Sequence, residues 1–370
     1  MKPLRLLLLS TPVGPLGSGL GGGVELTVTS LAQVMAKRGH RVAIAAPVGS
    51  VLPESDLSDP EAPELIKIPG TWQTTAQSQA RTAPALTGEA LANSWEYAWR
   101  AQAEYDLLVN FAYDWLPFYL TPFLSVPVAH FVSMGSLSDR IDAAIIRLSK
   151  QFPGTLAAYT RSQANTFISP SPVNWQILGS AIDINQYQYC GGPDNYLAWV
   201  GRISPEKGLK DAVEAAIAAY HPLKIFGKLE NSDYWQSIQK QISQTPDAQI
   251  EYCGFLPTAA LQQQLGKAKA LLMTPRWTEA FGIVAIEALA CGTPVLAYQQ
   301  GGPAEIIQSG KTGWLVPPGS IKEMVKAIAK LEHIDRQACR LQAQMHYSLD
   351  AWGNRFEEWF YGIVSGTIGS

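Results

Sequence analysis

One stretch near the C-terminal end restricts the fold of this chain more than any other. An apolar run at 270–273 is short enough for a buried strand. A segment with helical character follows, stops at a Gly-Thr-Pro triplet at 292–294, and gives way to a second apolar run at 295–297. The order strand, loop, helix, strand is the building unit of a parallel sheet covered by helices. The stretch therefore predicts an α/β protein.

The same plan occurs in the N-terminal half. An apolar run at 4–9 is typical of a strand buried on both faces. A glycine-rich loop, a helical segment at 24–38 and a strand at 42–46 follow it. The pattern restarts after residue 195, where we expect strands at 196–200, 223–226, 250–252, 270–273, 295–297 and 314–316. These repeats predict two Rossmann-like, doubly wound domains facing each other across a cleft.

Local composition indicates where the two halves meet. The segment 179–195 contains Gly, Pro, Asp and Asn with little periodicity, which is typical of a linker. We therefore expect an N-terminal domain over 1–180 and a C-terminal domain over 195–349. Residues 167–169 are expected to form the last strand of the first domain, and 48–84 an irregular excursion.

The overall composition excludes several classes of protein. A chain of 370 residues with 47% hydrophobic and 16% charged residues is typical of a packed protein of two domains. Its net charge of -3 is too small to imply a nucleic-acid partner, and no window is long and apolar enough to cross a membrane. The run Leu6–Leu9 is too short for a signal peptide. The four cysteines lack metal-ligand spacing, so we expect a reducing, cytoplasmic location.

Two carboxylates flank the start of the helix in the first stretch. Glu279 precedes the helix, which should begin near Phe281 and Gly282, and Glu287 lies one to two turns inside it. The free amides at the helix start favour an anion, and Gly282 allows the anion to approach the backbone. The two acids are too far apart to share a proton. They suit the two ends of one long ligand, with an anion held between them.

A loop earlier in the second half carries two cations. Arg202 and Lys207 lie in a segment that Pro205 and two glycines keep out of a regular helix. The side chains can therefore converge on one point, where they would stabilise a departing diphosphate.

Taken together, these motifs resemble the retaining GT-B glycosyltransferases of family 4, also called glycosyl transferases group 1. The resemblance implies sugar transfer from a nucleoside diphosphate with retained configuration. It places Glu279 at the donor sugar, Glu287 at the ribose hydroxyls, and the backbone of Phe255 at the nucleobase. It also implies that the helix expected at 350–365 crosses back onto the N-terminal domain. The residues it assigns to catalysis are Glu279, Arg202, Lys207 and His130, and to donor binding Gly22, Gly23, Phe255, Phe281, Gly282, Ile283 and Glu287.

No Asp-x-Asp pair occurs in the chain. Metal-dependent glycosyltransferases of the other main fold use such a pair to hold a divalent cation. Its absence agrees with cationic side chains taking that role here, so we expect an enzyme that needs neither a metal ion nor a cofactor.

An alternative comes from the N-terminal glycine loop. Residues 17–22 match the dinucleotide fingerprint, which would indicate an NAD(P)-dependent oxidoreductase. Such an enzyme also needs an acid at the end of the second strand, where this chain has Ala45, Ala46 and Pro47. We therefore favour a loop that closes over a diphosphate-sugar.

The acceptor is expected on the N-terminal domain. The segment from Ser10 to Thr27 is similar to cyanobacterial pterin glucosyltransferases, which use UDP-glucose and tetrahydrobiopterin. That similarity implies a pterin acceptor, for which Glu25, Tyr113 and Trp115 are the candidate contacts. A sugar, lipid or cell-envelope acceptor for the same chemistry remains the alternative.

Overall fold

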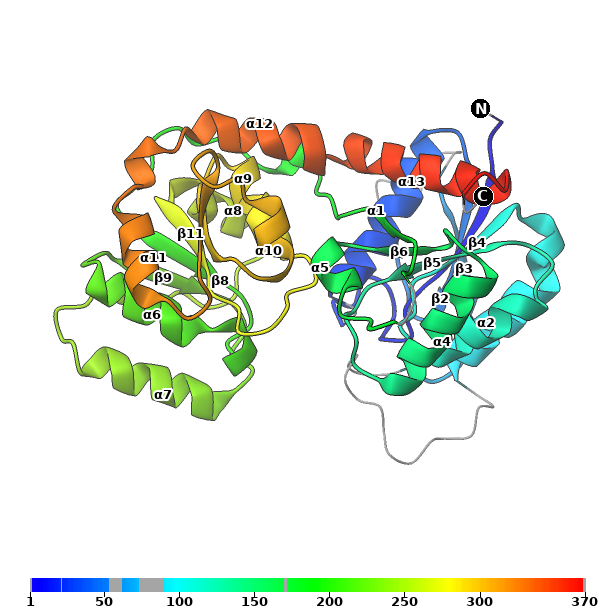
Figure 1. Ribbon diagram of the computed structural model, residues 1–370, viewed down its shortest axis with the longest axis horizontal. Helices are drawn as coiled ribbons and strands as arrows, with labels where there is room; N and C mark the ends of the chain where they lie inside the picture. The colour runs from blue at the N-terminus through cyan, green and yellow to red at the C-terminus, as the bar shows by residue number, and fades with distance from the viewer. Residues whose placement is uncertain (1, 21, 53–61, 73–88, 170–171, 369–370) are drawn as a thin grey trace. The chain divides into compact units, whose positions relative to one another are not determined.

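The computed structural model describes residues 2–20, 22–52, 62–72, 89–169 and 172–368. Gly21 of the glycine loop and most of the predicted excursion lie outside these ranges. The chain forms two compact units (Figure 1). The first comprises residues 1–159, 164–178 and 352–370, and the second comprises 160–163 and 179–351.

The first unit is built on a parallel sheet of seven strands in the order β3-β2-β1-β4-β5-β6-β7. Its helices lie on both sides of the sheet, with α1 and α13 above it and α2 and α4 below it in Figure 1. The strands are β1 (Arg5–Leu9), β2 (Arg41–Pro47), β3 (Glu64–Ile68), β4 (Leu107–Asn110), β5 (Val128–Val132), β6 (Leu156–Ala158) and β7 (Trp175–Ile177). The helices are α1 (Gly23–Lys37), α2 (Ala90–Ala101), α3 (Trp115–Leu120), α4 (Asp139–Gln151) and most of α13 (Leu349–Val364), with 3-10 turns η2 (Gln102–Glu104) and η3 (Thr121–Phe123).

Two predictions about this sheet are wrong. Residues 167–169 form no strand, because Phe167 closes a turn by donating its amide to Ala164 O. The strand that completes the sheet is β7, whose Trp175 pairs with Leu156 of β6. In addition, β3 lies inside the segment predicted to be irregular and pairs with β2.

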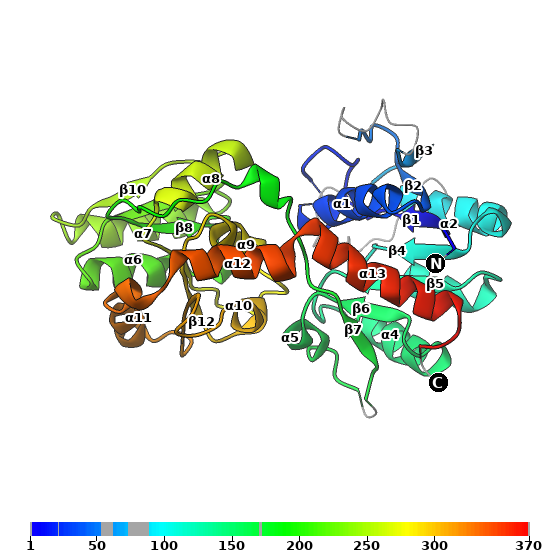
Figure 2. The same ribbon diagram turned by 90° about the horizontal axis from the view of Figure 1, so that it is seen from above.

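The last helix, α13, packs on the first unit through an aromatic face. The Phe356 ring lies 5.5 Å from the Phe131 ring, and Trp359 Nε1 donates to Gly154 O at 2.8 Å. On its polar side Glu357 pairs with Arg38 at 2.8 Å. Figure 2 shows α13 running beside the sheet of this unit.

The second unit is a parallel sheet of six strands in the order β10-β9-β8-β11-β12-β13. Its strands are β8 (Leu197–Val200), β9 (Leu223–Phe226), β10 (Ile250–Tyr252), β11 (Ala270–Met273), β12 (Val295–Tyr298) and β13 (Gly313–Val316), all near the predicted positions. Its helices are α6 (Leu209–Ala218), α7 (Ser232–Ser243), α8 (Thr258–Lys267), α9 (Ile283–Ala290), α10 (Gly301–Ile306), α11 (Ile321–Ile328) and α12 (Arg336–Tyr347). The 3-10 turns are η4 (Ile184–Gln186), η5 (Pro205–Lys207) and η6 (Leu331–His333), and α5 (Arg161–Ala164) joins the two units in sequence.

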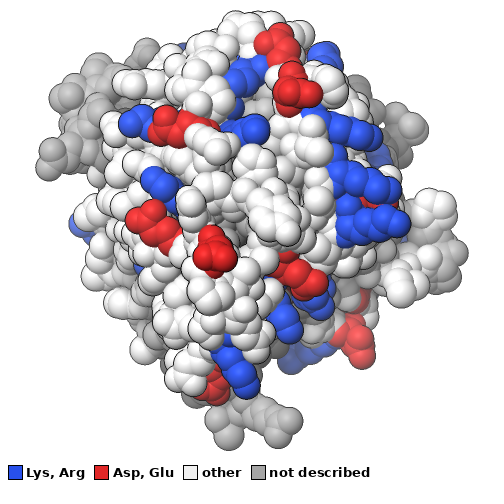
Figure 3. Space-filling view, turned by 90° about the vertical axis from the view of Figure 1, so that its left-hand side faces the viewer, with Lys and Arg blue, Asp and Glu red and all other residues white. Residues whose placement is uncertain are grey.

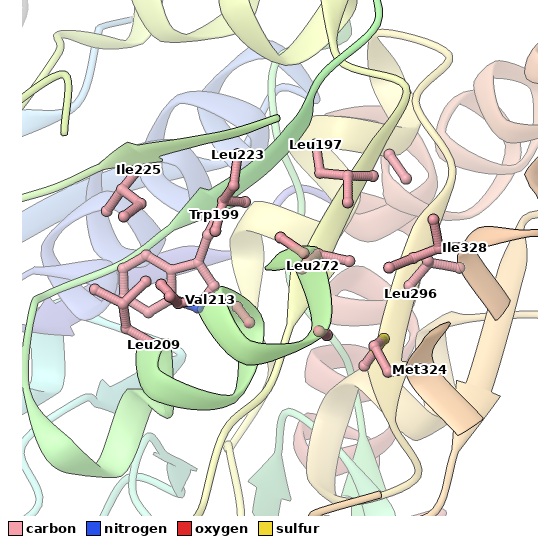
Figure 4. Close-up of a cluster of buried hydrophobic side chains, with 14 of the residues drawn as sticks. Leu197, Trp199, Leu209, Val213, Leu223, Ile225, Leu272, Leu296, Met324 and Ile328 are labelled. Atoms are coloured by element: carbon pink, nitrogen blue, oxygen red, sulfur yellow. The ribbon is translucent and has the colours of Figure 1, made fainter. Parts of the chain in front are cut away.

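A hydrophobic core holds α6, α7 and α11 against this second sheet. Trp199, Leu272 and Leu296 project from the strands toward the helices, where Val213 and Met324 meet them (Figure 4). All five side chains are buried, and burying each large one contributes about 1.5–3 kcal/mol. The outer surface is different: on the face drawn in Figure 3, acidic and basic side chains are interspersed.

Both sheets reverse their winding direction at one position. Strand β8 pairs with β9 on one side and with β11 on the other, and β1 pairs likewise with β2 and β4. In open parallel sheets, ligands bind beyond the carboxyl ends of the two strands at this switch point. A ligand site is therefore expected at the loops after β8 and β11. The prediction of two doubly wound sheets is confirmed.

Candidate active site

The loops that follow β8 and β11 are held together through their backbones. Gly208 adopts a left-handed conformation with φ 69°, and a Cβ there would lie 1.8 Å from Thr274 O. Thr274 Oγ1 donates to Gly208 O at 2.9 Å, and the Arg276 amide donates to Glu206 O at 2.8 Å. Only glycine allows this approach. The cation loop and the carboxylate loop are thus brought to one place, although some seventy residues separate them in sequence.

Lys207 and Glu279 meet at this junction. Lys207 Nζ lies 2.5 Å from Glu279 Oε2, and both side chains are mostly buried. Trp277 encloses the pair, since its Nε1 donates to Glu279 Oε2 at 3.2 Å and Lys207 Nζ lies 5.0 Å from its ring centroid. Trp277 was not among the site residues predicted from the sequence. Its position two residues before Glu279 in the same loop could have indicated that it lies at the site.

Arg202, the other predicted cation, is held by acids. Its guanidinium pairs with Glu230 and, at 3.2 Å, with Glu206 Oε1. Burial alone would raise the pKa of Glu206, but a hydrogen bond from Ser204 and the charges of Arg202 and Lys207 lower it below its ordinary value. The charges of both Arg202 and Lys207 therefore act on Glu206. Both cations are paired with carboxylates. A diphosphate, the ligand predicted for this loop, carries charge of the same sign as those carboxylates.

Helix α9 begins at the predicted place. Its N-cap is Gly282, in the left-handed conformation with φ 88°, and Ile283 is its first residue. Phe281 is buried, and Gly302 packs so closely that a Cβ there would lie 2.1 Å from Phe281 O. Gly302 also donates its amide to Glu279 O at 2.8 Å. The glycine pair that starts α10 thus fixes the loop preceding α9, so that the free amides at the α9 N-terminus occupy a defined position.

Glu287 lies one to two turns into α9, as predicted, and has a partner that the sequence did not indicate. Tyr187 donates its hydroxyl to Glu287 Oε1 at 2.8 Å from a segment before β8. Burial raises the pKa of Glu287, and the hydrogen bond from Tyr187 lowers it in part. No local pattern could have found Tyr187, because it precedes its partner by one hundred residues.

Phe255 lies in the loop after β10 with 59% of its surface exposed. Lys228 Nζ lies 5.0 Å from its ring centroid, and the Gly227 amide donates to Gly254 O at 2.9 Å. The loop after β9 therefore fixes the loop that carries Phe255. An exposed ring beside a cation is available to a planar ligand, and the predicted role of this loop at a nucleobase stays a prediction.

In the first unit, the glycine loop folds onto Glu25. The Glu25 carboxylate is buried in the first turn of α1 and accepts hydrogen bonds from the amides of Gly17 and Gly19. Gly22 caps α1 with a positive φ of 57°, which glycine adopts most readily, and Gly23 is the first helical residue. A Cβ at Gly22 or Gly23 would meet nothing within 4 Å, so backbone freedom and open space distinguish them.

Tyr113 and Trp115 follow β4, beside the glycine loop's strand in the sheet. The Tyr113 hydroxyl accepts the amide of Leu137 at 3.1 Å, and burial raises its pKa to about 12. The Trp115 ring has the Arg140 guanidinium 4.2 Å from its centroid. Both rings are therefore packed within the first unit, and their predicted contact with an acceptor, like that of Glu25, stays a prediction.

His130 lies inside the first unit, and its predicted contact with the donor sugar stays a prediction. His130 lies in the middle of β5, has no exposed surface, and its ring nitrogens meet Asn110 Nδ2 at 3.2 Å and Thr121 Oγ1 at 2.9 Å. Burial lowers its pKa to about 3, so the imidazole is neutral. Ligands meet such sheets beyond the strand ends, where Ser133 follows β5. In the described structure, the recognised partners of the His130 ring are therefore side chains of the protein's own core.

The described residues contain neither a candidate metal cluster nor a candidate membrane span. Within the described ranges, no group of three or more His, Cys, Asp or Glu side chains is arranged to hold a metal ion. No helix in the part of the chain that is described is long and apolar enough to span a membrane.

Comparison with known proteins shows what the chain is similar to. Residues 190–346 match the family model "Glycosyl transferases group 1". A mannosyltransferase, alg-2 of Neurospora crassa, is 35% identical over 26% of this chain, but that match spans only 20% of its own length. Glycogen synthase of Mycobacterium tuberculosis is 25% identical over 88% of this chain and 85% of its own.

A solved structure shares the whole fold. It is the Anabaena protein Alr3699/HepE in complex with UDP, with a TM-score of 0.75 and 18% identity over 97% of this chain and 100% of that one. The same protein has also been solved with UDP-glucose, and that structure aligns with a TM-score of 0.68.

Proposed function

We propose that the chain is a nucleotide-sugar-dependent glycosyltransferase of the group 1 family with the GT-B fold, and that it transfers glucose from UDP-glucose to a small acceptor. The observation that carries the donor assignment is the junction of Lys207, Glu279 and the α9 N-terminus at the switch point of the second sheet. Cations and helix amides at one point suit a diphosphate. HepE, which shares this fold, binds UDP and UDP-glucose.

In this proposal, Arg202 and Lys207 exchange their carboxylate partners for the diphosphate of the donor. Their charges stabilise the negative charge that develops on the leaving group as the sugar bond breaks. Glu279 lies at the sugar and Glu287 at the ribose. The anomeric configuration is retained, with the acceptor attacking from the face that the leaving group vacates and the donor phosphate taking its proton.

The proposed acceptor is a pterin such as tetrahydrobiopterin, bound by the first unit. The segment from Ser10 to Thr27 supports this assignment by its similarity to pterin glucosyltransferases. A flat heteroaromatic acceptor also suits a site near Tyr113 and Trp115, whose rings follow β4.

The first test is isothermal titration of the purified protein with UDP and with NAD. We expect UDP to bind and NAD not to bind, and saturable NAD binding without UDP binding would overturn the transferase proposal. Incubation with a panel of UDP-sugars and pterins, read by mass spectrometry, then identifies donor and acceptor. Product from UDP-glucose and a pterin supports the full proposal, whereas glucosylation of only sugar or lipid acceptors would retain the enzyme class and reject the pterin.

A further inference from the structure

Residues 183–190 form a short segment that is fastened to the helices of the second unit. Asp183 caps the 3-10 turn η4 by accepting the amide of Asn185 at 3.1 Å. Arg340 of α12 donates through Nη1 to Tyr187 O at 2.7 Å and to Ala290 O, at the end of α9, at 2.6 Å. One guanidinium therefore fixes the backbone of Tyr187 relative to the helix that carries Glu287.

The Tyr187 side chain is held as firmly as its backbone. Its ring is buried, and its hydroxyl donates to Glu287 Oε1 at 2.8 Å. In the described part of the chain, no side chain or amide is recorded as a donor to Glu287 Oε2. A carboxylate has about four lone-pair positions, so one oxygen is anchored while the other keeps its capacity to accept.

We propose that Tyr187 is a positioning residue that orients Glu287 to recognise the 2′-hydroxyl of a ribonucleotide donor. The inference rests on the proposed function, in which Glu287 binds the ribose. With Oε1 anchored, Oε2 has one orientation in which to accept a hydroxyl. A 2′-deoxyribose would leave this half-buried charged acceptor without its partner, and that loss is costly because the acceptor has already been removed from water.

The same anchor explains why a phenol suits this position. Burial raises the pKa of Glu287 and so favours its protonated form, which would donate from one oxygen instead of accepting. A hydroxyl donor favours the ionised form. Tyr187 lies before residue 190, where the match to the family model begins.

The test compares the affinities of UDP and 2′-deoxy-UDP by isothermal titration. For the wild-type protein we expect UDP to bind about 10-fold or more tightly than 2′-deoxy-UDP, since a hydrogen bond to a charged group supplies a factor of about 10–100. In Tyr187→Phe the ring and its packing are kept and only the hydroxyl is lost. We expect the preference for UDP to fall to about threefold or less. Tyr189→Phe is the matched control, because the same change two residues along affects a ring that is 44% exposed, whereas the hydroxyl bonded to Glu287 is that of Tyr187.

A general loosening of the fold would weaken both nucleotides equally and leave the ratio unchanged, so the ratio separates positioning from structure. Glu287→Gln should also abolish the preference, and adding Tyr187→Phe to it should change the ratio no further. A wild-type ratio in Tyr187→Phe would overturn this inference while leaving the proposed function intact. Failure of the wild-type protein to bind UDP would instead overturn the proposed function, and this inference with it.

Discussion

The two units use their polar residues in opposite ways. In the second unit, the predicted residues Arg202, Lys207 and Glu279 lie in loops beyond strand ends and pair with one another or with neighbouring acids. In the first unit, His130 and Glu25 are buried and bind the protein's own hydroxyls and amides. A polar residue at the end of a strand can exchange its partner for a ligand more readily than one inside the core. The comparison predicts a large loss of activity in the second unit and a loss of stability in the first.

The largest expected effect is that of Lys207→Ala. Its ammonium lies 2.5 Å from Glu279 and is proposed to stabilise the leaving diphosphate. Removing one preorganised charge from such a site costs about 10²–10³ in turnover. Steady-state kinetics with UDP-glucose and the identified acceptor measure the loss, mainly in kcat. Lys210→Ala, in the exposed part of α6, is the control and should keep wild-type kinetics.

An undiminished kcat in Lys207→Ala would contradict the proposed difference between the two units.

Treatment with a chelator provides a second check of the same chemistry. If cationic side chains take the place of a metal ion, turnover should survive excess chelator, and an inactive enzyme that recovers with a divalent cation would contradict that assignment.

The next effect concerns His130 and is one of stability. Its folded-state pKa is lowered to about 3 by burial, against an ordinary value of about 6.5. Between these values the unfolded chain binds a proton that the folded protein does not. His130 therefore contributes its full stabilisation of the folded state above about pH 6.5. Its contribution to the free energy of unfolding falls by about 1.4 kcal/mol per pH unit as the pH drops toward 3.

Melting temperatures of the wild-type protein and His130→Gln at pH 7.5 and 5 measure this linkage. The variant should be less stable at pH 7.5, because Gln replaces the hydrogen bonds to Asn110 and Thr121 imperfectly. The variant has no imidazole to protonate at this position. The difference in melting temperature between the wild-type protein and the variant should therefore be smaller at pH 5. UDP affinity should be unchanged. A constant difference together with weakened UDP binding would place His130 at the active site.

The same contrast explains what the sequence could predict. The second unit's site depends on short-range features: a proline and glycines that keep 201–208 a loop, and a glycine at the start of α9. Such features are visible in consecutive residues, and the Gly208 approach to Thr274 then brings the loops together. The six strands of this unit were predictable for the same reason, because each is a short apolar run.

The position of His130 within its strand was harder to predict, for a different physical reason. Placing it required knowing where β5 ends, and a shift of three residues moves a side chain from the strand end at Ser133 into the middle of the core. An apolar run gives no sharp boundary of that kind. The contact between Tyr187 and Glu287 was unpredictable for another reason, because it depends on tertiary packing of α12 against a segment far away in sequence.

The smallest expected effect is a gain, in Glu230→Gln. Glu230 pairs with Arg202 and is 49% exposed, so this ion pair contributes at most about 1 kcal/mol. A diphosphate must nevertheless displace Glu230 before it reaches the guanidinium. Removing the competing charge should tighten UDP binding by about two- to threefold at low salt, and the gain should shrink at high salt as the charges are screened. Glu206, which also pairs with Arg202, limits the gain in UDP affinity because it remains in place.

Isothermal titration of Glu230→Gln with UDP at two ionic strengths measures both the gain and its salt dependence, with Glu332→Gln in η6 as a control that removes the same charge. Weaker UDP binding in Glu230→Gln would mean that Glu230 orients Arg202 for the ligand and does not compete with it.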